Sequence, residues 1–252
     1  MPSDLPWIPP STFEEKLRWA LIPPKLIVWD YLRRELARGE KELGLVQFLS
    51  ERARVAVDVG ANRGVWSEIM RRHAAHVHAF EPNPKLFKEL SRGARSGITP
   101  HLIALSDKSG TARLHVPKRR KSYSNHAASL SAEAIGNVPF GVVDVNAKRL
   151  DDLALGDIGF IKIDVEGHEA AVIAGAKQTL QRCRPNLIIE IEERHTRRPI
   201  ADSIAEVCSH GYEAFALRKG ALQRVSQLDL DHVHTNPRSP ADYLCNWIFL
   251  PL

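Results

Sequence analysis

The sequence has few cysteines: three in 252 residues, at Cys183, Cys208 and Cys245. They are odd in number, widely spaced and without the spacing of metal ligands, which fits free thiols in a reducing cytoplasm. No apolar run approaches the roughly 18 residues of a membrane-spanning helix. The first ten residues hold four prolines and no basic segment followed by an apolar stretch, so we expect no signal peptide and a cytoplasmic protein.

The sequence also lacks a strong excess of charge of one sign. The formal net charge of +5 is mild for this length and does not by itself indicate a nucleic-acid partner. With 44% hydrophobic and 26% charged residues, the composition is typical of a globular protein that can build one sizeable core. We therefore expect one α/β domain over residues 51–252, preceded by a helical extension over residues 1–50.

The extension predicts helices with a large apolar surface. Ser11–Glu15 resembles a capped helix start, and the helical spacing continues to about Trp19. After the break at Pro23 and Pro24, residues 25–45 predict one or two amphipathic helices. Because apolar helical stripes usually pack into a core, we expect this region to pack on the sheet edge; a substrate lid or a dimer surface is the alternative.

The most informative stretch is Val55–Gly64, with the sequence VAVDVGANRG. Its apolar, largely β-branched first half is typical of a strand buried on both faces, and Gly60 and Gly64 then form a tight turn into a helix over residues 65–72. In an open α/β sheet, ligands bind at the carboxyl ends of the strands, close to where Asp58 lies. This turn is therefore the predicted cofactor site.

A missing glycine indicates which cofactor binds. The turn is not G-x-G-x-x-G, because Asn62 stands where dinucleotide-binding enzymes have the glycine that approaches a pyrophosphate. S-adenosylmethionine has no phosphate: the turn can bind its carboxylate, Asp58 can face its ammonium group, and Asn62 offers both a donor and an acceptor. Glu81 ends the next predicted strand, 21 residues after Gly60 (81 − 60), where an acid accepts hydrogen bonds from a ribose diol.

Alternating strands and helices define the fold class. Further strands are predicted at residues 75–80, 100–105, 111–116, 138–145, 158–163, 186–191, 212–217 and 243–250, with helices at 85–90, 167–180 and 201–210. The polar residues 117–137 predict a functional or disordered loop, and residues 218–242 predict irregular structure. This alternation indicates a mostly parallel sheet with helices on both faces. Ser106 and Asp107 follow the third strand, where we expect them to contact the adenine of the cofactor.

Four motifs in this order resemble the FkbM-type S-adenosylmethionine-dependent methyltransferases, which belong to the class I methyltransferases. They are Asp58–Gly64 (DVGANRG), Phe80–Pro82 (FEP), Ala104–Gly110 (ALSDKSG) and Ile161–Glu169 (IKIDVEGHE). The first two are common to many class I enzymes, whereas the fourth is specific. The resemblance covers roughly residues 55–193. It implies a Rossmann-like, seven-stranded sheet with an antiparallel last strand, and an enzyme that methylates a hydroxyl of a sugar, glycan or natural product.

The strand at residues 158–163 ends in the residues that we expect to carry the chemistry. Methyl transfer to a hydroxyl needs a base near the acceptor, and His168 is the first candidate because a neutral imidazole is basic near neutral pH. Asp164 follows the strand's carboxyl end, where it can bind the cofactor's ammonium group or orient the acceptor. A carboxyl there is a poor base unless its pKa is raised.

The next strand should border the same cleft. Glu190 is a further candidate base, and Glu192 and His195, together with Glu166, are expected to bind the acceptor's hydroxyl groups. The spacing of these residues matches no recognised ligand set, so we predict no metal. Lys162 lies inside a predicted buried strand, where we expect a salt bridge to a neighbouring acid.

Three rival functions remain open. Lys118–Lys121 together with Arg194, Arg197 and Arg198 favour a nucleic-acid methyltransferase, but the fourth motif lacks the Asn/Asp-Pro-Pro-aromatic and Pro-Cys patterns of such enzymes. We therefore expect a small-molecule or glycan acceptor, and the basic loop equally fits an anionic glycan or a lipid-linked diphosphate sugar. A protein that binds S-adenosylmethionine without catalysis is the second rival. A dehydrogenase is the third, because Glu81 suits the ribose of NAD as well. The sequence favours no oligomeric state.

Overall fold

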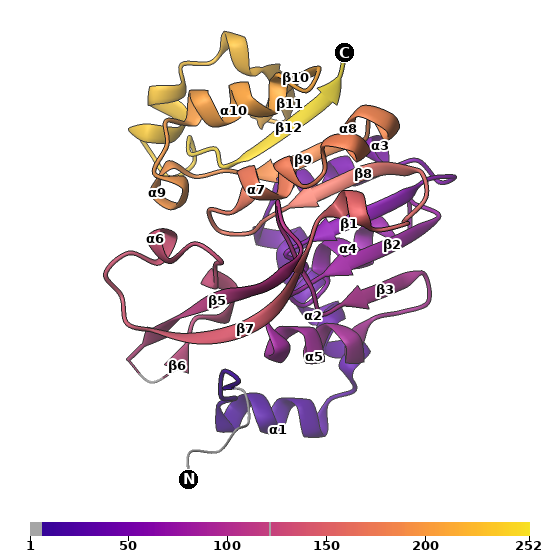
Figure 1. Cartoon of the computed structure of the whole chain (residues 1–252), viewed down its shortest axis with the longest axis vertical. Helices are drawn as coiled ribbons and strands as arrows, with labels where there is room; N and C mark the ends of the chain where they lie inside the picture. Colours follow the sequence, from indigo (N-terminus) through magenta and orange to yellow (C-terminus); the bar gives the residue numbers. More distant parts are fainter. Residues whose placement is uncertain (1–6, 121) are drawn as a thin grey trace.

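The computed structural model describes residues 7–120 and 122–252, and its centre is an eight-stranded sheet (Figure 1). The strand order is β11-β10-β12-β9-β8-β1-β2-β3. The bounds are β1 Val55–Val59, β2 His76–Phe80, β3 Ile98–His101, β8 Ile158–Ile163, β9 Asn186–Glu190, β10 Tyr212–Arg218, β11 Ala221–Arg224 and β12 Asn246–Pro251. Strands β3, β2, β1, β8 and β9 are parallel neighbours, and β12 runs antiparallel between β9 and β10. The predicted Rossmann-like sheet with an antiparallel last strand is confirmed, with β11 added at one edge.

The added strand corrects one prediction. Residues 218–242 were expected to be irregular, yet β11 pairs antiparallel with β10. Lys219 and Gly220 between these strands both have positive φ, of 53° and 80°. A two-residue hairpin turn of this handedness matches the twist of its strands, so β11 folds back beside β10.

Helices cover both faces of the sheet. Because side chains alternate along a strand, Val57 and Ile161 join the core on one face, and Ala56 and Phe160 join the core on the other. The main helices are α4 Val65–Met70, α5 Pro84–Gly93, α7 Glu169–Ala174, α8 Lys177–Cys183 and α10 Ile200–Cys208. Among the described residues, no helix is both long enough and apolar enough to cross a bilayer.

Helices α7 and α8 replace the single helix predicted at residues 167–180. They separate at Gly175, where an added Cβ atom would lie 2.0 Å from the backbone oxygen of Ser106. The chain breaks its helix there because a loop from another part of the molecule passes too close for a side chain.

The N-terminal extension folds as α1 (Phe13–Leu21), α2 (Pro24–Arg38), the short 3-10 helix η1 (Lys41–Leu45) and α3 (Val46–Leu49). Thr12 caps α1 as predicted, in a capping box with Glu15. Helix α2 packs on α4 and α5 rather than on the sheet edge, and it buries Ile27 and Leu32. Leu32 belongs to the same core cluster as Phe160 of β8, so the extension and the sheet share one core.

A second, smaller sheet was not predicted as such. It has the order β4-β7-β5-β6, with β4 Ala104–Leu105, β5 Gly110–Arg119, β6 Ser122–Tyr123 and β7 Phe140–Lys148. The strand predicted at residues 100–105 is therefore divided, since β3 lies in the main sheet and β4 in the small one. The predicted loop at residues 117–137 contributes the end of β5, β6, the 3-10 helix η2 (Asn125–Ala127) and α6 (Ala132–Ile135). We call this sheet with η2 and α6 the cap; Figure 1 shows it beside the ends of β1, β2 and β8.

Candidate active site

The glycine turn between β1 and α4 is pressed against the ends of two neighbouring strands. Gly60 and Gly64 have φ of +79° and +81°, and Asn62 has φ of +50°, all in the left-handed region that favours glycine. A Cβ atom on Gly60 would lie 1.8 Å from the backbone oxygen of Asp164, after β8. The Gly60 N–H donates to the Phe80 carbonyl of β2 at 2.9 Å. Only glycine at position 60 allows β8 to approach this closely.

Glu81 is a buried carboxyl that fixes the turn from the end of β2. Its two oxygens accept from the backbone N–H groups of Asn62 and Asn83, each at 2.8 Å. Burial raises the pKa of Glu81 to about 7, against the lowering effect of these two hydrogen bonds. A carboxylate has about four acceptor positions, so Glu81 can still accept from a ribose diol.

Asp58 and Gly64 lie on the helix side of the turn. Asp58 is buried and accepts from the Ser67 hydroxyl of α4 at 2.5 Å. Burial raises the pKa of Asp58 to about 6, against the lowering effect of the Ser67 hydrogen bond. Gly64 is the residue before α4, and a Cβ there would lie 2.6 Å from Leu90 of α5. Both residues support the conformation of the turn, and neither lines the pocket described next.

A pocket of about 590 Å³ lies between the strand ends and the cap. This volume includes the space at the mouth of the pocket that is open to solvent. The predicted site residues that line it are Gly60, Asn62, Glu81, Asp164, Glu166 and His168. Its apolar wall is formed by Val59, Phe80, Leu86, Ile103, Leu105 and Leu114. A polar turn beside an apolar wall fits a nucleoside that carries an amino-acid tail, as the expected cofactor does.

His168 is hydrogen-bonded in a way that leaves it a basic nitrogen. Its Nε2 lies 2.9 Å from the Ser106 hydroxyl, which in turn donates to Asp107 at 3.1 Å. Because the hydroxyl has one hydrogen, its oxygen accepts from Nε2–H, and Nδ1 is the unprotonated nitrogen. Burial lowers the pKa of His168 below its ordinary value of 6.5, so the ring is neutral at neutral pH. Ser106 contacts His168, and Asp107 contacts Ser106. Both lie outside the pocket lining, and their adenine contact stays a prediction.

Lys162 forms the buried ion pairs expected of it. Its Nζ lies 3.1 Å from the Asn246 amide oxygen, 3.9 Å from Glu190 and 4.0 Å from Glu40. Burial raises the pKa of Glu190 to about 9, against the lowering effect of Lys162. Burial likewise raises the pKa of Asp164, although Lys162 opposes the shift. The structure thus places Glu190 beside Lys162, away from the pocket lining.

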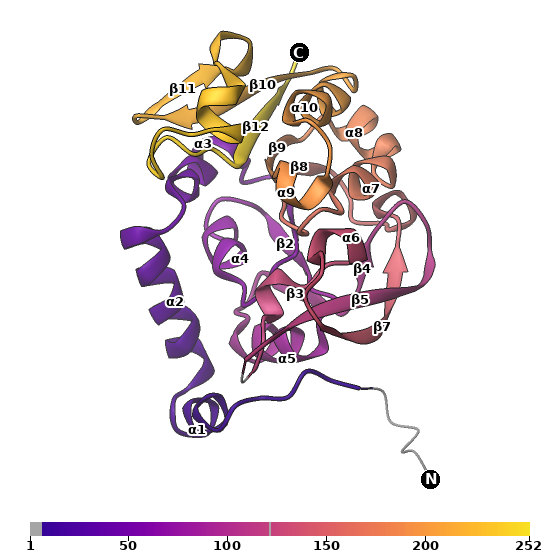
Figure 2. The same ribbon diagram turned by 90° about the vertical axis from the view of Figure 1, so that its left-hand side faces the viewer.

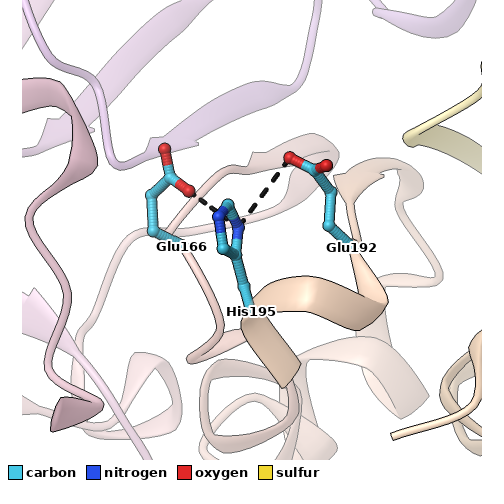
Figure 3. A group of neighbouring side chains, drawn as sticks. All are labelled: Glu166, Glu192 and His195. Atoms are coloured by element: carbon cyan, nitrogen blue, oxygen red, sulfur yellow. Dashed lines mark ion pairs between the residues drawn. The ribbon is translucent and has the colours of Figure 1, made fainter. Parts of the chain in front are cut away.

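The three predicted acceptor-binding residues come together beside the pocket (Figure 3), although only Glu166 lines it. His195 Nδ1 lies 2.8 Å from a Glu166 oxygen and 3.8 Å from a Glu192 oxygen. The hydrogen bond to Glu166 raises the pKa of His195. Glu192 also accepts from Arg194 at 2.5 Å and from the Tyr243 hydroxyl. Candidate ligand atoms of the three lie within 4.8 Å of one another, but the donors around Glu192 make this an ion-pair network.

The cap supplies residues that the sequence did not identify. Asn125, His126, Ala128 and Leu130 line the pocket from η2 and the chain that follows it. Burial lowers the pKa of His126, so it is a second neutral histidine at the site. The Asn83 side chain, after Glu81, donates to Asn125 at 3.1 Å and ties the cap to β2. The one available signal was the length of the predicted loop, which indicated function without naming a residue.

Comparisons with known proteins agree with this geometry. The model of the methyltransferase FkbM domain matches residues 58–214. Methyltransferase sdnD of Sordaria araneosa is 30% identical over 183 residues, which cover 60% of this chain and 71% of sdnD. 2-O-methyltransferase NoeI of Sinorhizobium fredii is 29% identical over 156 residues, 56% of this chain and 64% of NoeI. Hexuronic acid methyltransferase AglP of Haloferax volcanii is 30% identical over 154 residues, 57% of this chain and 59% of AglP.

A solved structure shows the same fold. Methyltransferase FkbM from Methylobacillus flagellatus superposes with a TM-score of 0.51 at 18% identity, and covers 79% of this chain. This chain spans 44% of that protein and less than two thirds of NoeI and AglP. The family model matches more than half of the chain, from the glycine turn to β10. The chain therefore belongs to the FkbM methyltransferase family.

Proposed function

We propose that this protein transfers a methyl group from S-adenosylmethionine to a hydroxyl of a sugar, glycan or other natural product. The observation that carries the proposal is one pocket, of about 590 Å³, lined by the glycine turn and Glu81 on one side and by Asp164 and His168 on the other. The first side fits the cofactor, and the second supplies the base that a hydroxyl acceptor needs.

The cofactor side would hold S-adenosylmethionine without a phosphate-binding loop. Glu81 accepts from the ribose hydroxyls, the side chain of Asn62 faces the amino-acid tail, and Asp58 supplies negative charge behind the turn. When bound, the cofactor offers a methyl group on a positively charged sulfur. The protein's part is to hold the acceptor oxygen in line with that methyl group, at roughly 3 Å.

His168 is the proposed base. Its Nδ1 is the unprotonated nitrogen because Ser106 accepts from Nε2–H, and Asp107 fixes the direction of the Ser106 hydroxyl. The proton of the acceptor hydroxyl passes to Nδ1 as the new carbon–oxygen bond forms, and the imidazolium is neutralised by solvent after product release. The lowered pKa keeps the ring ready to accept a proton at neutral pH.

The proposed acceptor contacts are Asp164, Glu166, Glu192 and His195. His195 and the carboxylates around it form a mixed set of donors and acceptors, which suits the hydroxyls of a sugar. The names of two relatives support this class, since NoeI is called a 2-O-methyltransferase and AglP a hexuronic acid methyltransferase. We place the reaction in the cytoplasm, in keeping with three cysteines that are all free thiols.

Two measurements test the proposal in order. Calorimetric titration with S-adenosylmethionine is expected to show binding at one site, and NAD is expected to show none. The protein is then incubated with a panel of glycans and hydroxylated metabolites and with cofactor that carries a trideuterated methyl group. A trideuteromethyl ether in the wild type, absent with Glu81→Ala and present with the surface control Glu213→Gln, supports the function. Tight binding without product from the whole panel would favour a non-catalytic protein.

A further inference from the structure

Helix α1 carries an apolar stripe that the fold does not use. Phe13, Leu17 and Leu21 recur at a spacing of four residues, so they lie along one face of the helix. Their side chains are 77%, 47% and 72% exposed, and no residue of α1 is buried. An amphipathic helix normally turns such a stripe toward the core, whereas this one turns it toward solvent.

Helix α2 continues this surface on its outer side. Its inner side packs on α4 and α5, whereas Leu26, Trp29 and Leu36 point outward with 55%, 51% and 56% of their side chains exposed. Figure 2 shows α2 along the outside of the molecule, with α1 at its lower end. We call Phe13, Leu17, Leu21, Leu26, Trp29 and Leu36 the N-terminal apolar face.

Polar contacts hold α1 in this orientation. Glu15 pairs with Lys85 of α5 at 2.8 Å, and Arg18 pairs with Asp30 of α2 at 2.8 Å. Arg18 also donates to the Tyr31 hydroxyl at 3.1 Å. The charged side of the helix thus faces the protein and its apolar stripe faces outward, which is the reverse of the usual arrangement. The outward stripe is therefore built into the packing of α1.

The exposed charges around this face are mostly of one sign. Among the described side chains of residues 13–37, the exposed charged ones are Lys16, Lys25, Arg33, Arg34 and Glu14, four basic and one acidic. Arg34 pairs with the half-buried Asp30 at 2.9 Å, so Lys16, Lys25 and Arg33 carry the excess positive charge. The Arg33 guanidinium lies 5.9 Å from the centre of the Trp29 ring, beside the apolar face. Apolar side chains with a tryptophan and a basic rim are the pattern by which helices lie in the interface of an anionic membrane.

We propose that the N-terminal apolar face docks on the surface of a bilayer that contains anionic lipids. The six apolar side chains enter the headgroup region, and the basic rim contacts the lipid phosphates. A second copy of the chain fits this face less well. A two-fold dimer would place the same face, with its basic rim, against itself and bring like charges together.

The test uses the full chain and vesicles of defined composition. Co-sedimentation is measured with phosphatidylcholine vesicles that contain about one third phosphatidylglycerol, and with pure phosphatidylcholine vesicles as the neutral probe. We expect binding to the anionic vesicles and at least roughly tenfold weaker binding to the neutral ones, because the attraction between the basic side chains and the anionic headgroups is lost. Leu17→Ser with Leu21→Ser, and separately Lys25→Gln with Arg33→Gln, should each reduce binding. Leu222→Ser, on an exposed leucine of β11, should not.

Two further readouts decide the outcome. Brominated lipids should quench tryptophan fluorescence in the wild type and much less in Trp29→Phe, which places this face in the interface. Sedimentation equilibrium without vesicles should show a monomer. The proposal is overturned if anionic vesicles do not bind the wild type, or if the control variant loses binding as strongly as the leucine variant. It is equally overturned if the protein is a dimer that Leu17→Ser with Leu21→Ser dissociates.

Discussion

The two sides of the pocket are built in different ways. On the side of β1 and β2, the backbone does the positioning: the Gly60 N–H bonds to Phe80, and Glu81 accepts from two backbone N–H groups. On the side of β8 and β9, side chains position one another, as in the chain from Asp107 through Ser106 to His168. The first side is held by hydrogen bonds from the backbone, whereas the second is held by hydrogen bonds between side chains.

This difference matches what each side is proposed to bind. A cofactor is the same molecule in every turnover, and fixed backbone groups recognise it without any side-chain rearrangement. An acceptor differs between members of a family, and side chains on strand ends and loops can change while the sheet stays constant. Substitutions on the first side should therefore act on cofactor affinity, and those on the second should act on turnover or on acceptor affinity.

The largest effect is expected from Glu81→Ala. Two hydrogen bonds from ribose hydroxyls to a charged acceptor are worth about 1.5–3 kcal/mol each, so affinity for S-adenosylmethionine should fall by roughly 1,000-fold. Calorimetry measures the affinity, and circular dichroism checks that the fold is intact. Glu213→Gln, at a surface ion pair with Arg224, is the control. Retained affinity in Glu81→Ala would show that the cofactor lies elsewhere.

On the side of the pocket formed by β1 and β2, the structure could be predicted from the sequence for a physical reason. A glycine turn after a buried strand is a local feature, and its hydrogen bonds involve residues whose spacing is fixed by the β-α-β unit. Asn62 and Glu81 are 19 residues apart, and one parallel crossover brings them within 2.8 Å. The strand at 158–163 was predictable too, because all six of its residues are buried.

The cap was not predictable because nothing local requires it. His126 and Leu130 reach the pocket only because β5 and β7 pair at long range and carry the chain over the strand ends. Residues 117–137 are mostly polar, and their few apolar side chains pack against the core of the small sheet only after this pairing. Glu190 is a different case: its position in the sequence suggested the cleft, and its side chain lies beside buried Lys162, outside the pocket lining.

The next largest effect should come from His168→Ala. A general base contributes roughly 100-fold or more to a rate, so turnover should fall by at least that factor while cofactor affinity stays within about threefold. The lowered pKa of His168 means that the active, neutral form is lost only as pH falls through a value below 6.5. The turnover rate of the wild type should therefore fall as the pH drops below that value, and this fall should be absent in His168→Ala. His126→Ala is the matched variant: if it removes this fall and His168→Ala does not, His126 is the base.

A smaller effect is expected in the protons exchanged on cofactor binding. Glu81 and Asp58 have pKa values of about 7 and about 6 in the free protein, both raised by burial. Hydroxyl donors and an ammonium group favour the carboxylates, so binding at pH 6.5 should release about one proton. The release should fade above about pH 8, where both groups are already ionised. Calorimetry in buffers of different ionisation enthalpy measures it, and Glu81→Gln should remove most of it. A release unchanged by that variant would contradict the assignment.

The smallest effect, and the one that separates the two sides most sharply, is expected from His195→Gln. Protonated His195 is held by Glu166 at 2.8 Å, and a single hydrogen bond to the acceptor is worth about 1 kcal/mol, so the acceptor KM should rise by roughly fivefold. Its pKa is raised, so the protonated form is present below 6.5 and is lost as pH rises through the higher value in the folded protein. In the wild type the acceptor KM should therefore climb with pH, and in His195→Gln it should be flat. Glu192→Gln should act in the same direction, whereas cofactor affinity should stay unchanged in both, because neither residue contacts the glycine turn. If His195→Gln instead weakens cofactor binding, the two sides of the pocket are coupled through Glu166 and Asp164, and the division between a fixed cofactor side and an adjustable acceptor side fails.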